Sequence, residues 1–418
     1  MDAARRPWHR GGMGMDRPKL RRLERYRLDR DDEQLLVLRD PLELCEPFAV
    51  DAEFTPVLDA LDGQRSLAQI RQSLMMRGVL EVDAEDLQLF VEDLAEAGLL
   101  DDEHFRARWS VAHDDFLDQE QRLPRRAGLL YPEDPGALAR WLAPALPGQE
   151  APSAEASADA PPLAIVTPHQ PPPLVADGLR RLLGLLPDPA RYRRVVILAT
   201  DHSPGLLPYA SADKDWVTPL GLVPADLELL AALDERVPWL LREQIRLRAS
   251  DPLEWTTLLL RALWGERCPP VLPIACGQTR LTTRDGRDQA DELVGALETL
   301  LGPATAAGEV LWWTAAELSH IGPAFGHPEL PAREAVEAED RAILAPLLDG
   351  RPGELVRRCM ERPSARWPSG AAALATLAEL LPLDARASLI DYQVLEAPGD
   401  RPGWIGAAAL AVRAQQVC

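Results

Sequence analysis

Three histidines follow short apolar runs of the kind that form buried strands. They are His169 after LAIV, His202 after VVILA and His320 after VLWWT. Ligands of open α/β sheets bind at the carboxyl ends of the strands. We therefore expect the three imidazoles to lie within about 3–5 Å of one another, because ligands that share a metal ion each lie roughly 2.0–2.2 Å from it.

A carboxylate, Glu317, precedes the last of these histidines by three positions. Two imidazoles and one carboxylate are the usual ligands of non-haem iron and leave coordination positions open for substrate or O₂. His169, His202 and Glu317 supply this set. With His320 instead, the three histidines suit zinc, copper or iron. The alternative is that each histidine is an ordinary hydrogen-bonded loop residue.

The elements around these residues predict an α/β fold. From residue 163 onward, apolar runs alternate with amphipathic helical segments, which indicates a central sheet with helices on both faces. Upstream, two short strands and three short helices predict a small winged-helix-like α+β domain. The predicted organisation is a basic disordered tail (1–22), the small domain (23–103), a connector (104–123) and the α/β domain (124–418), with a flexible Ala/Ser/Pro loop at 147–162.

Composition narrows the function. The 418 residues carry 45 Lys and Arg against 66 Asp and Glu, a net charge of −21, which disfavours binding to phosphate backbones. The first 30 residues are cationic, so the tail either remains free or binds an acidic partner or the body of the protein itself. No apolar run is long enough to predict a membrane span. Five cysteines without a C-x-x-C pair or a signal peptide favour the reducing cytoplasm.

The segment from Leu61 to Ile70, LDGQRSLAQI, resembles the LDG-x-x-[ST]-[LV]-x-x-[IL] motif of PqqD-like peptide-recognition domains. The order of strand pair and three helices around it is similar as well. The resemblance implies a domain that binds an extended peptide by adding it to an edge strand beside a helix. The alternative is a module that only docks on the following domain.

The larger region, from about residue 124 to 412, resembles the Memo-like family, as found in the AmmeMemoRadiSam system protein B. Arg125 to Pro135 matches R-x-A-G-x-x-Y-P-x-D-P, and SADKDWVTPLGLVPADLELL matches S-x-x-x-x-W-x-T-P-L-G-x-V-P-x-D. The family segments P-H-A-G, P-S-H-H and S-D-L-S-H-Y-G fall on PHQP around His169, TDHS around His202 and AELSHIG around His320. The resemblance implies a fold like that of the class III extradiol dioxygenases, with metal ligands at these strand ends.

Carried over by position, the first two ligands are His169 and His202. The third falls on Ser319, and because a neutral serine is a poor ligand, Glu317 or His320 would complete the set. The implied cofactor is a divalent metal, iron before copper or zinc.

The sequence departs from the family at E-H-S-x-E, which here reads Ser250–Glu254 and has Asp251 in place of the histidine. Since a proton-transfer histidine normally lies within hydrogen-bond reach of the substrate, its absence indicates altered chemistry or none. Asp201, Glu254 and Glu317 are the candidate acids and bases. The sequence thus predicts a metal-dependent oxidoreductase-type protein acting on a peptide or peptide-bound substrate, or alternatively a non-catalytic adaptor or scaffold.

Overall fold

The structure, a computed structural model, divides the chain into two compact units, residues 1–114 and 115–418. It describes residues 17–30, 33–79, 81–148, 161–203, 205–361, 368–399 and 401–414. Residues 1–16 of the predicted tail and 149–160 of the predicted loop lie outside the described residues.

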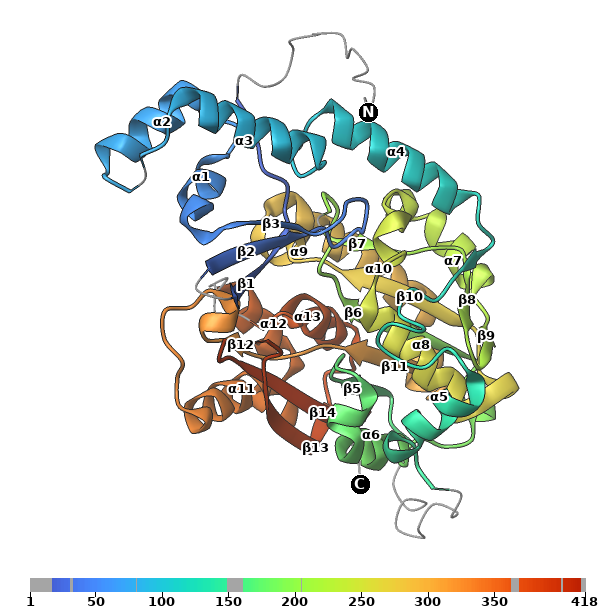
Figure 1. The fold of residues 1–418 in the computed structure, drawn as a ribbon. Helices are drawn as coiled ribbons and strands as arrows, with labels where there is room; N and C mark the ends of the chain where they lie inside the picture. The colour runs from blue at the N-terminus through green and yellow to red at the C-terminus, as the bar shows by residue number, and fades with distance from the viewer. Residues whose placement is uncertain are drawn as a thin grey trace. The chain divides into compact units, whose positions relative to one another are not determined.

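The first unit contains a three-stranded antiparallel sheet and short helices (Figure 1). Its order is β1-β2-β3, and the third strand, whose four residues are too few for a readable alternation, was not predicted. Leu38, Leu58, Ile70 and Val91 are among the residues of its core. The elements are β1 (Glu24–Arg30), β2 (Glu33–Arg39), β3 (Phe48–Asp51), α1 (Thr55–Ala60), α2 (Leu67–Met76), α3 (Ala84–Glu96) and α4 (Glu103–Leu117), which runs across the division between the units.

Local sequence signals set the ends of these helices. At the start of α2, Ser66 and Gln69 form a reciprocal capping box, and Asp83 caps α3 by accepting from the Asp86 N–H. After α3 the chain turns at Gly98, whose φ of +77° favours glycine.

Part of the predicted tail belongs to the folded unit. Leu20 N–H donates to the carbonyl of Leu61 at 2.9 Å, and the buried Arg21 pairs with Asp40 at 2.8 Å. The predicted boundary at residue 22 therefore differs from the structure, in which Leu20 and Arg21 already contact the first unit. The prediction placed Arg21 in a solvated tail because the segment is basic. Composition alone cannot show that an arginine has a buried carboxylate partner, here Asp40.

The second unit is built on an eight-stranded sheet in the order β12-β14-β5-β11-β6-β10-β7, with β13 paired to β14. Its central strands β5, β11, β6 and β10 are parallel, and the flanking β14 and β7 are antiparallel to them. A small sheet, β4-β8-β9, lies apart from it. The strands are β4 (Gln121–Arg122), β5 (Ala164–Thr167), β6 (Arg194–Thr200), β7 (Tyr209–Ala210), β8 (Asp215–Thr218), β9 (Gly221–Val223), β10 (Val271–Cys276), β11 (Val310–Ala315), β12 (His320–Ile321), β13 (Ala385–Glu396) and β14 (Trp404–Ala414).

Both faces of the large sheet are buried. Along β6, Val196 and Leu198 belong to one apolar cluster while Val195 and Ile197 belong to the other, as expected for a strand whose side chains alternate between two covered faces. The helices are α5 (Pro135–Leu142), α6 (Ala176–Leu183), α7 (Leu227–Asp234), α8 (Asp251–Trp264), α9 (Thr279–Thr282), α10 (Arg284–Ala306), α11 (Arg333–Leu348), α12 (Pro352–Glu361) and α13 (Ala371–Leu380).

The mixed α/β architecture with its large sheet is thus confirmed. Of the two terminal strands, predicted to add at an edge, β13 pairs with β14 alone, whereas β14 lies inside the sheet beside β5. In the described residues, no helix has the length and apolar character needed to cross a membrane.

Candidate functional site

The predicted ligands follow three adjacent parallel strands. His169 follows β5, His202 follows β6, and Glu317 and His320 follow β11, which lies between the other two strands. Because parallel strands end at the same edge of the sheet, sequence segments more than a hundred residues apart meet there. The parallel pairing of β5, β11 and β6 therefore brings these side chains together.

The side chains of this cluster, defined as His169, His202, Glu317 and His320, contact one another through their polar atoms. The Nε2 atoms of His169 and His202 are 3.2 Å apart. Glu317 Oε2 lies 3.2 Å from His169 Nε2 and 3.0 Å from His320 Nε2. The cluster thus forms a continuous polar chain with the carboxylate between two imidazoles.

Exposure changes along that chain. Glu317 is 1% exposed and His169 9%, whereas His202 lies open to solvent. The other carboxylate oxygen, Glu317 Oε1, accepts a hydrogen bond of 2.6 Å from the amide of Gln170. The cluster therefore has a buried side fixed by hydrogen bonds and an exposed side formed by His202.

Burial and charge set the protonation of this cluster. Burial, only partly offset by Glu317, lowers the pKa of His169 to about 4. Burial alone would raise the pKa of Glu317, but the neighbouring imidazoles outweigh it and lower that pKa to about 2. For His320, burial is outweighed by the hydrogen bond and charge of Glu317, so its pKa is raised. At neutral pH His169 is therefore uncharged, whereas Glu317 favours the protonated form of His320.

The fit of this cluster to a metal ion is partial. Two ligand atoms about 2.1 Å from one ion and about 100° apart are separated by about 3.2 Å, the separation of the His169 and His202 nitrogens. Neutral imidazole is also the form that binds metals. Across the described ranges, however, no group of three or more His, Cys, Asp or Glu side chains is arranged to hold an ion. A third donor would have to turn toward the histidine pair.

Ser319, on which the expected third ligand position falls, contacts Asp340 instead. Its Oγ donates to Asp340 Oδ1 at 2.6 Å and its N–H to the same oxygen at 3.1 Å, while Tyr392 donates to the other oxygen at 2.8 Å. Asp340 is fully buried, and a side chain at Gly406 would collide with it. This Asp340 anchor holds the segment that carries Glu317 and His320.

Asp201, a predicted acid or base, neighbours His202 in sequence but pairs with the buried Arg246. Arg246 Nε donates to Asp201 Oδ2 at 2.7 Å, and the N–H of Ser203 donates to Asp201 Oδ1 at 2.7 Å. Arg246 also donates to the carbonyl of Leu207 at 2.9 Å. These contacts hold the loop after β6 in place, a positioning task.

Glu254, the other predicted acid or base, belongs to a separate cluster at the start of α8. It forms an ion pair with the buried Arg122 and accepts hydrogen bonds from Arg126 N–H at 2.8 Å and Tyr131 Oη at 2.7 Å. Nearby, Asp251 pairs with Arg126. The recorded contacts of Glu254 join α8 to residues 122–131 and include no member of the histidine cluster.

Sequence reasoning missed several residues that shape the site. Gln170, Arg246 and Asp340 were not singled out, and Phe325 packs edge-on to the His320 ring at 5.0 Å between centroids. The signal available for Gln170 was its place directly after His169. Arg246 and Asp340 lie in helical segments remote in sequence from their partners, so their roles depend on the fold.

Comparison with known proteins agrees with this architecture. Residues 122–409 match the family described as Memo-like protein. Since that match covers well over half of the chain, the protein belongs to the Memo-like family.

Two relatives illustrate the likeness. The chain is 24% identical over 295 residues to a MEMO1 family protein of Aquifex aeolicus, covering 70% of this chain and 73% of the relative. It is 27% identical over 294 residues to a MEMO1 family protein of Thermus thermophilus, covering 69% of this chain and 82% of the relative. The family match begins at residue 122, so the small domain lies outside it.

Proposed function

We propose that the Memo-like unit binds one divalent metal ion, iron before copper or zinc, at the histidine cluster, and that the protein is a metal-dependent oxidoreductase of dioxygenase-like fold. The observation that supports this most strongly is the pair of imidazole nitrogens 3.2 Å apart beside a buried carboxylate. His169 and His202 would hold the ion, with Glu317 or His320 as the third ligand. A redox-active ion bound there would supply open coordination positions for a substrate.

The surrounding residues have distinct tasks in this proposal. Gln170 keeps Glu317 oriented, the Asp340 anchor keeps the segment after β11 in place, and Arg246 keeps the loop before and after His202 in place. The third ligand, Glu317 or His320, would complete the site by a side-chain rotation toward the pair of His169 and His202, whose nitrogens are already 3.2 Å apart.

Metal analysis tests the proposal. Protein purified without chelators, or titrated with Fe²⁺, Cu²⁺ and Zn²⁺, is expected to hold about one ion per chain, and the His169→Ala/His202→Ala double variant none. His104→Ala, which removes a histidine in the first unit, is the matched control and should retain the ion. Comparing Glu317→Gln with His320→Ala identifies the third ligand as the one whose loss weakens affinity more.

Equal metal content in the wild type and the double variant would contradict the ligand assignment. Absence of binding to any of the three ions would favour the alternative function, a non-catalytic adaptor or scaffold that keeps the fold.

For the first unit we propose peptide recognition of the PqqD-like, winged-helix type. The supporting observation is that, in the part of the chain the structure describes, β3 pairs with β2 alone, so its other edge is available for strand addition. Calorimetric titration of the full chain with peptides encoded by neighbouring genes tests this. Binding to none of them would favour a docking module.

A further inference from the structure

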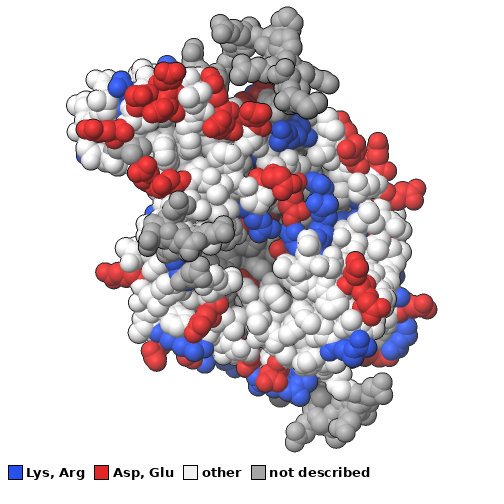
Figure 2. Space-filling view, in the orientation of Figure 1, with Lys and Arg blue, Asp and Glu red and all other residues white. Residues whose placement is uncertain are grey.

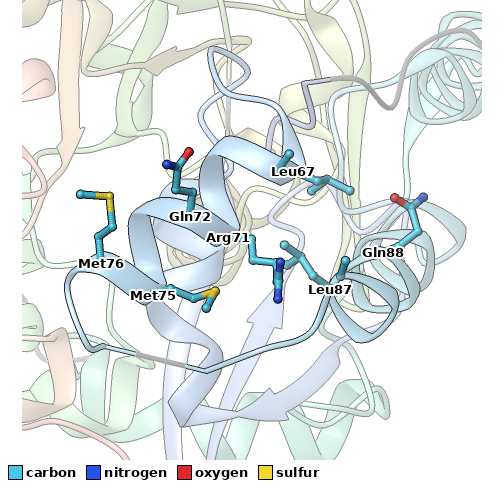
Figure 3. Close-up of a pocket in the computed structure, with 9 residues that line it drawn as sticks. Leu67, Arg71, Gln72, Met75, Met76, Leu87 and Gln88 are labelled. Atoms are coloured by element: carbon cyan, nitrogen blue, oxygen red, sulfur yellow. The ribbon is translucent and has the colours of Figure 1, made fainter.

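The first unit carries an open apolar groove between α2 and α3. Its volume is about 450 Å³, and Figure 3 shows side chains of both helices around it. Met76 is 80% exposed and Met75 48%. The residues that line the groove are Leu67, Ala68, Arg71, Gln72, Met75, Met76, Ala84, Leu87 and Gln88.

Such a surface is costly in water. Large exposed apolar side chains that gather in one place mark interaction sites, and methionine side chains adapt to the shape of what they bind. The groove lies on the two helices, apart from the edge of β3 to which the peptide-recognition proposal refers.

The rim of the groove is acidic. The approach to α3 and its first turn expose Glu81, Asp83, Glu85 and Asp86, and Figure 2 shows acidic side chains gathered over the region of α2 and α3. Of the nearby cations, Arg71 donates its Nε to the carbonyl of Val82 at 2.9 Å, and Arg77 is exposed at the end of α2, so the four carboxylates outnumber the cations. An occupant with apolar anchors and positive charge therefore complements this surface.

Residues 1–16 have this composition. They contain Trp8, Met13 and Met15 as apolar anchors, and residues 3–15 include three arginines and no acidic residue. These residues lie outside the described ones, but the point from which they extend is defined.

The described chain begins next to the segment that leads into α2. Gly63 N–H donates to the carbonyl of Pro18 at 3.1 Å, and Lys19 forms an isolated antiparallel β-bridge with Asp62 through the backbone. From Gly63 to the start of α2 is at most about 14 Å along an extended chain, and the ten residues of α2 add about 15 Å. Sixteen residues can span about 50 Å, so the whole groove lies within reach.

We propose that residues 1–16 bind in the groove between α2 and α3 of their own chain. Trp8, Met13 or Met15 would contact the methionines, and the arginines would face the acidic rim. Because the segment is tethered, its effective concentration is on the order of millimolar. A modest intrinsic affinity is then enough to keep the groove covered.

A competition experiment tests this. A chain lacking residues 2–16 is titrated with a fluorescein-labelled peptide of residues 1–16, and binding is followed by fluorescence anisotropy. The truncated chain should bind the peptide, and the full chain at least tenfold more weakly because its own segment occupies the groove. Met76→Glu in the truncated chain should weaken binding at least tenfold, whereas Val111→Glu, an equal change at an exposed position outside the groove, should leave it unchanged.

Three results would overturn the proposal. They are no peptide binding to the truncated chain, equal binding to the truncated and full chains, and equal binding to the truncated chain with and without Met76→Glu. Light scattering tests the other possible occupant, a second copy of the chain. If the full chain is a dimer that Met76→Glu dissociates, a second copy binds in the groove and the proposal is wrong. Circular dichroism of each variant checks that it is folded.

Discussion

Glu317 and Glu254 are both glutamates of the Memo-like unit that are almost fully buried, 1% and 3% exposed, yet their surroundings differ. Glu254 is surrounded by donors that keep their protons, namely the guanidinium of Arg122, backbone N–H groups and a tyrosine hydroxyl. Glu317 contacts two imidazoles and an amide. Both glutamates are therefore buried, and they differ in the chemical type of the groups that contact them.

This difference bears on function. Burial would raise the pKa of Glu254, but Arg122 and the backbone donors outweigh it and lower that pKa, so the group is an anion at neutral pH. Around Glu317, imidazoles can lose a proton, rotate or bind a metal at neutral pH. The first environment suits a structural joint and the second suits a site that exchanges ligands.

The largest expected effect comes from Glu254→Gln. Removing the charge leaves the buried Arg122 without its counter-ion, which typically costs about 3–5 kcal/mol. Urea unfolding should show this loss, while the metal content of the folded fraction stays equal to that of the wild type. The double variant Arg122→Met/Glu254→Gln should recover part of the stability. A loss of bound metal without a loss of stability would reverse the assignment of the two glutamates.

A smaller effect is expected from pH. His169 has a folded pKa of about 4 against an ordinary value of 6.5, so between these values the unfolded state binds a proton that the folded state does not. Stability should therefore fall as the pH decreases from 6.5 to 4, by at most about 3 kcal/mol.

Urea unfolding in chelator at several pH values measures this slope. His169→Gln should flatten it, while Glu254→Gln should leave it in place because lowering of a carboxyl pKa removes stability only at more acidic pH. An unchanged slope in His169→Gln would show that another group is responsible.

The smallest effect is expected from Ser319→Ala. It removes one hydrogen bond to the buried Asp340 and should cost about 1–2 kcal/mol. Tyr392→Phe removes another donor to the same carboxylate and should cost a similar amount. Because Ser319 lies between Glu317 and His320, only Ser319→Ala should weaken metal affinity as well, which competition with a chelator measures. Equal affinities in the two variants would argue against the positioning role of the Asp340 anchor.

Much of the second unit was readable in advance because its strands are short, continuous apolar runs. LAIV, VVILA, VLPIA and VLWWT correspond to β5, β6, β10 and β11 within one residue at each end. The helices and the two terminal strands also follow their patterns. The inner position of β14 could not be predicted, since an apolar run carries no information on which strand it will pair with.

The candidate site was predicted unequally. His169, His202 and Glu317 come together because each lies two residues beyond the end of a strand, and His320 follows at the start of β12. Asp201 and Glu254 were chosen as acids or bases by residue type, and the structure pairs them with Arg246 and Arg122 instead. The roles of His169, His202, Glu317 and His320 as metal ligands remain predictions that the variants above test.

The sequence by itself determined the strands, the family and the side chains that stand at the strand ends, because each of these follows from local pattern and spacing. Only the tertiary structure decided which charged groups share a buried pair and which share the open cluster. The physical reason is that the environment of a carboxylate depends on partners more than a hundred residues away. Those partners are brought to it by strand order and helix packing, which no local stretch of sequence contains.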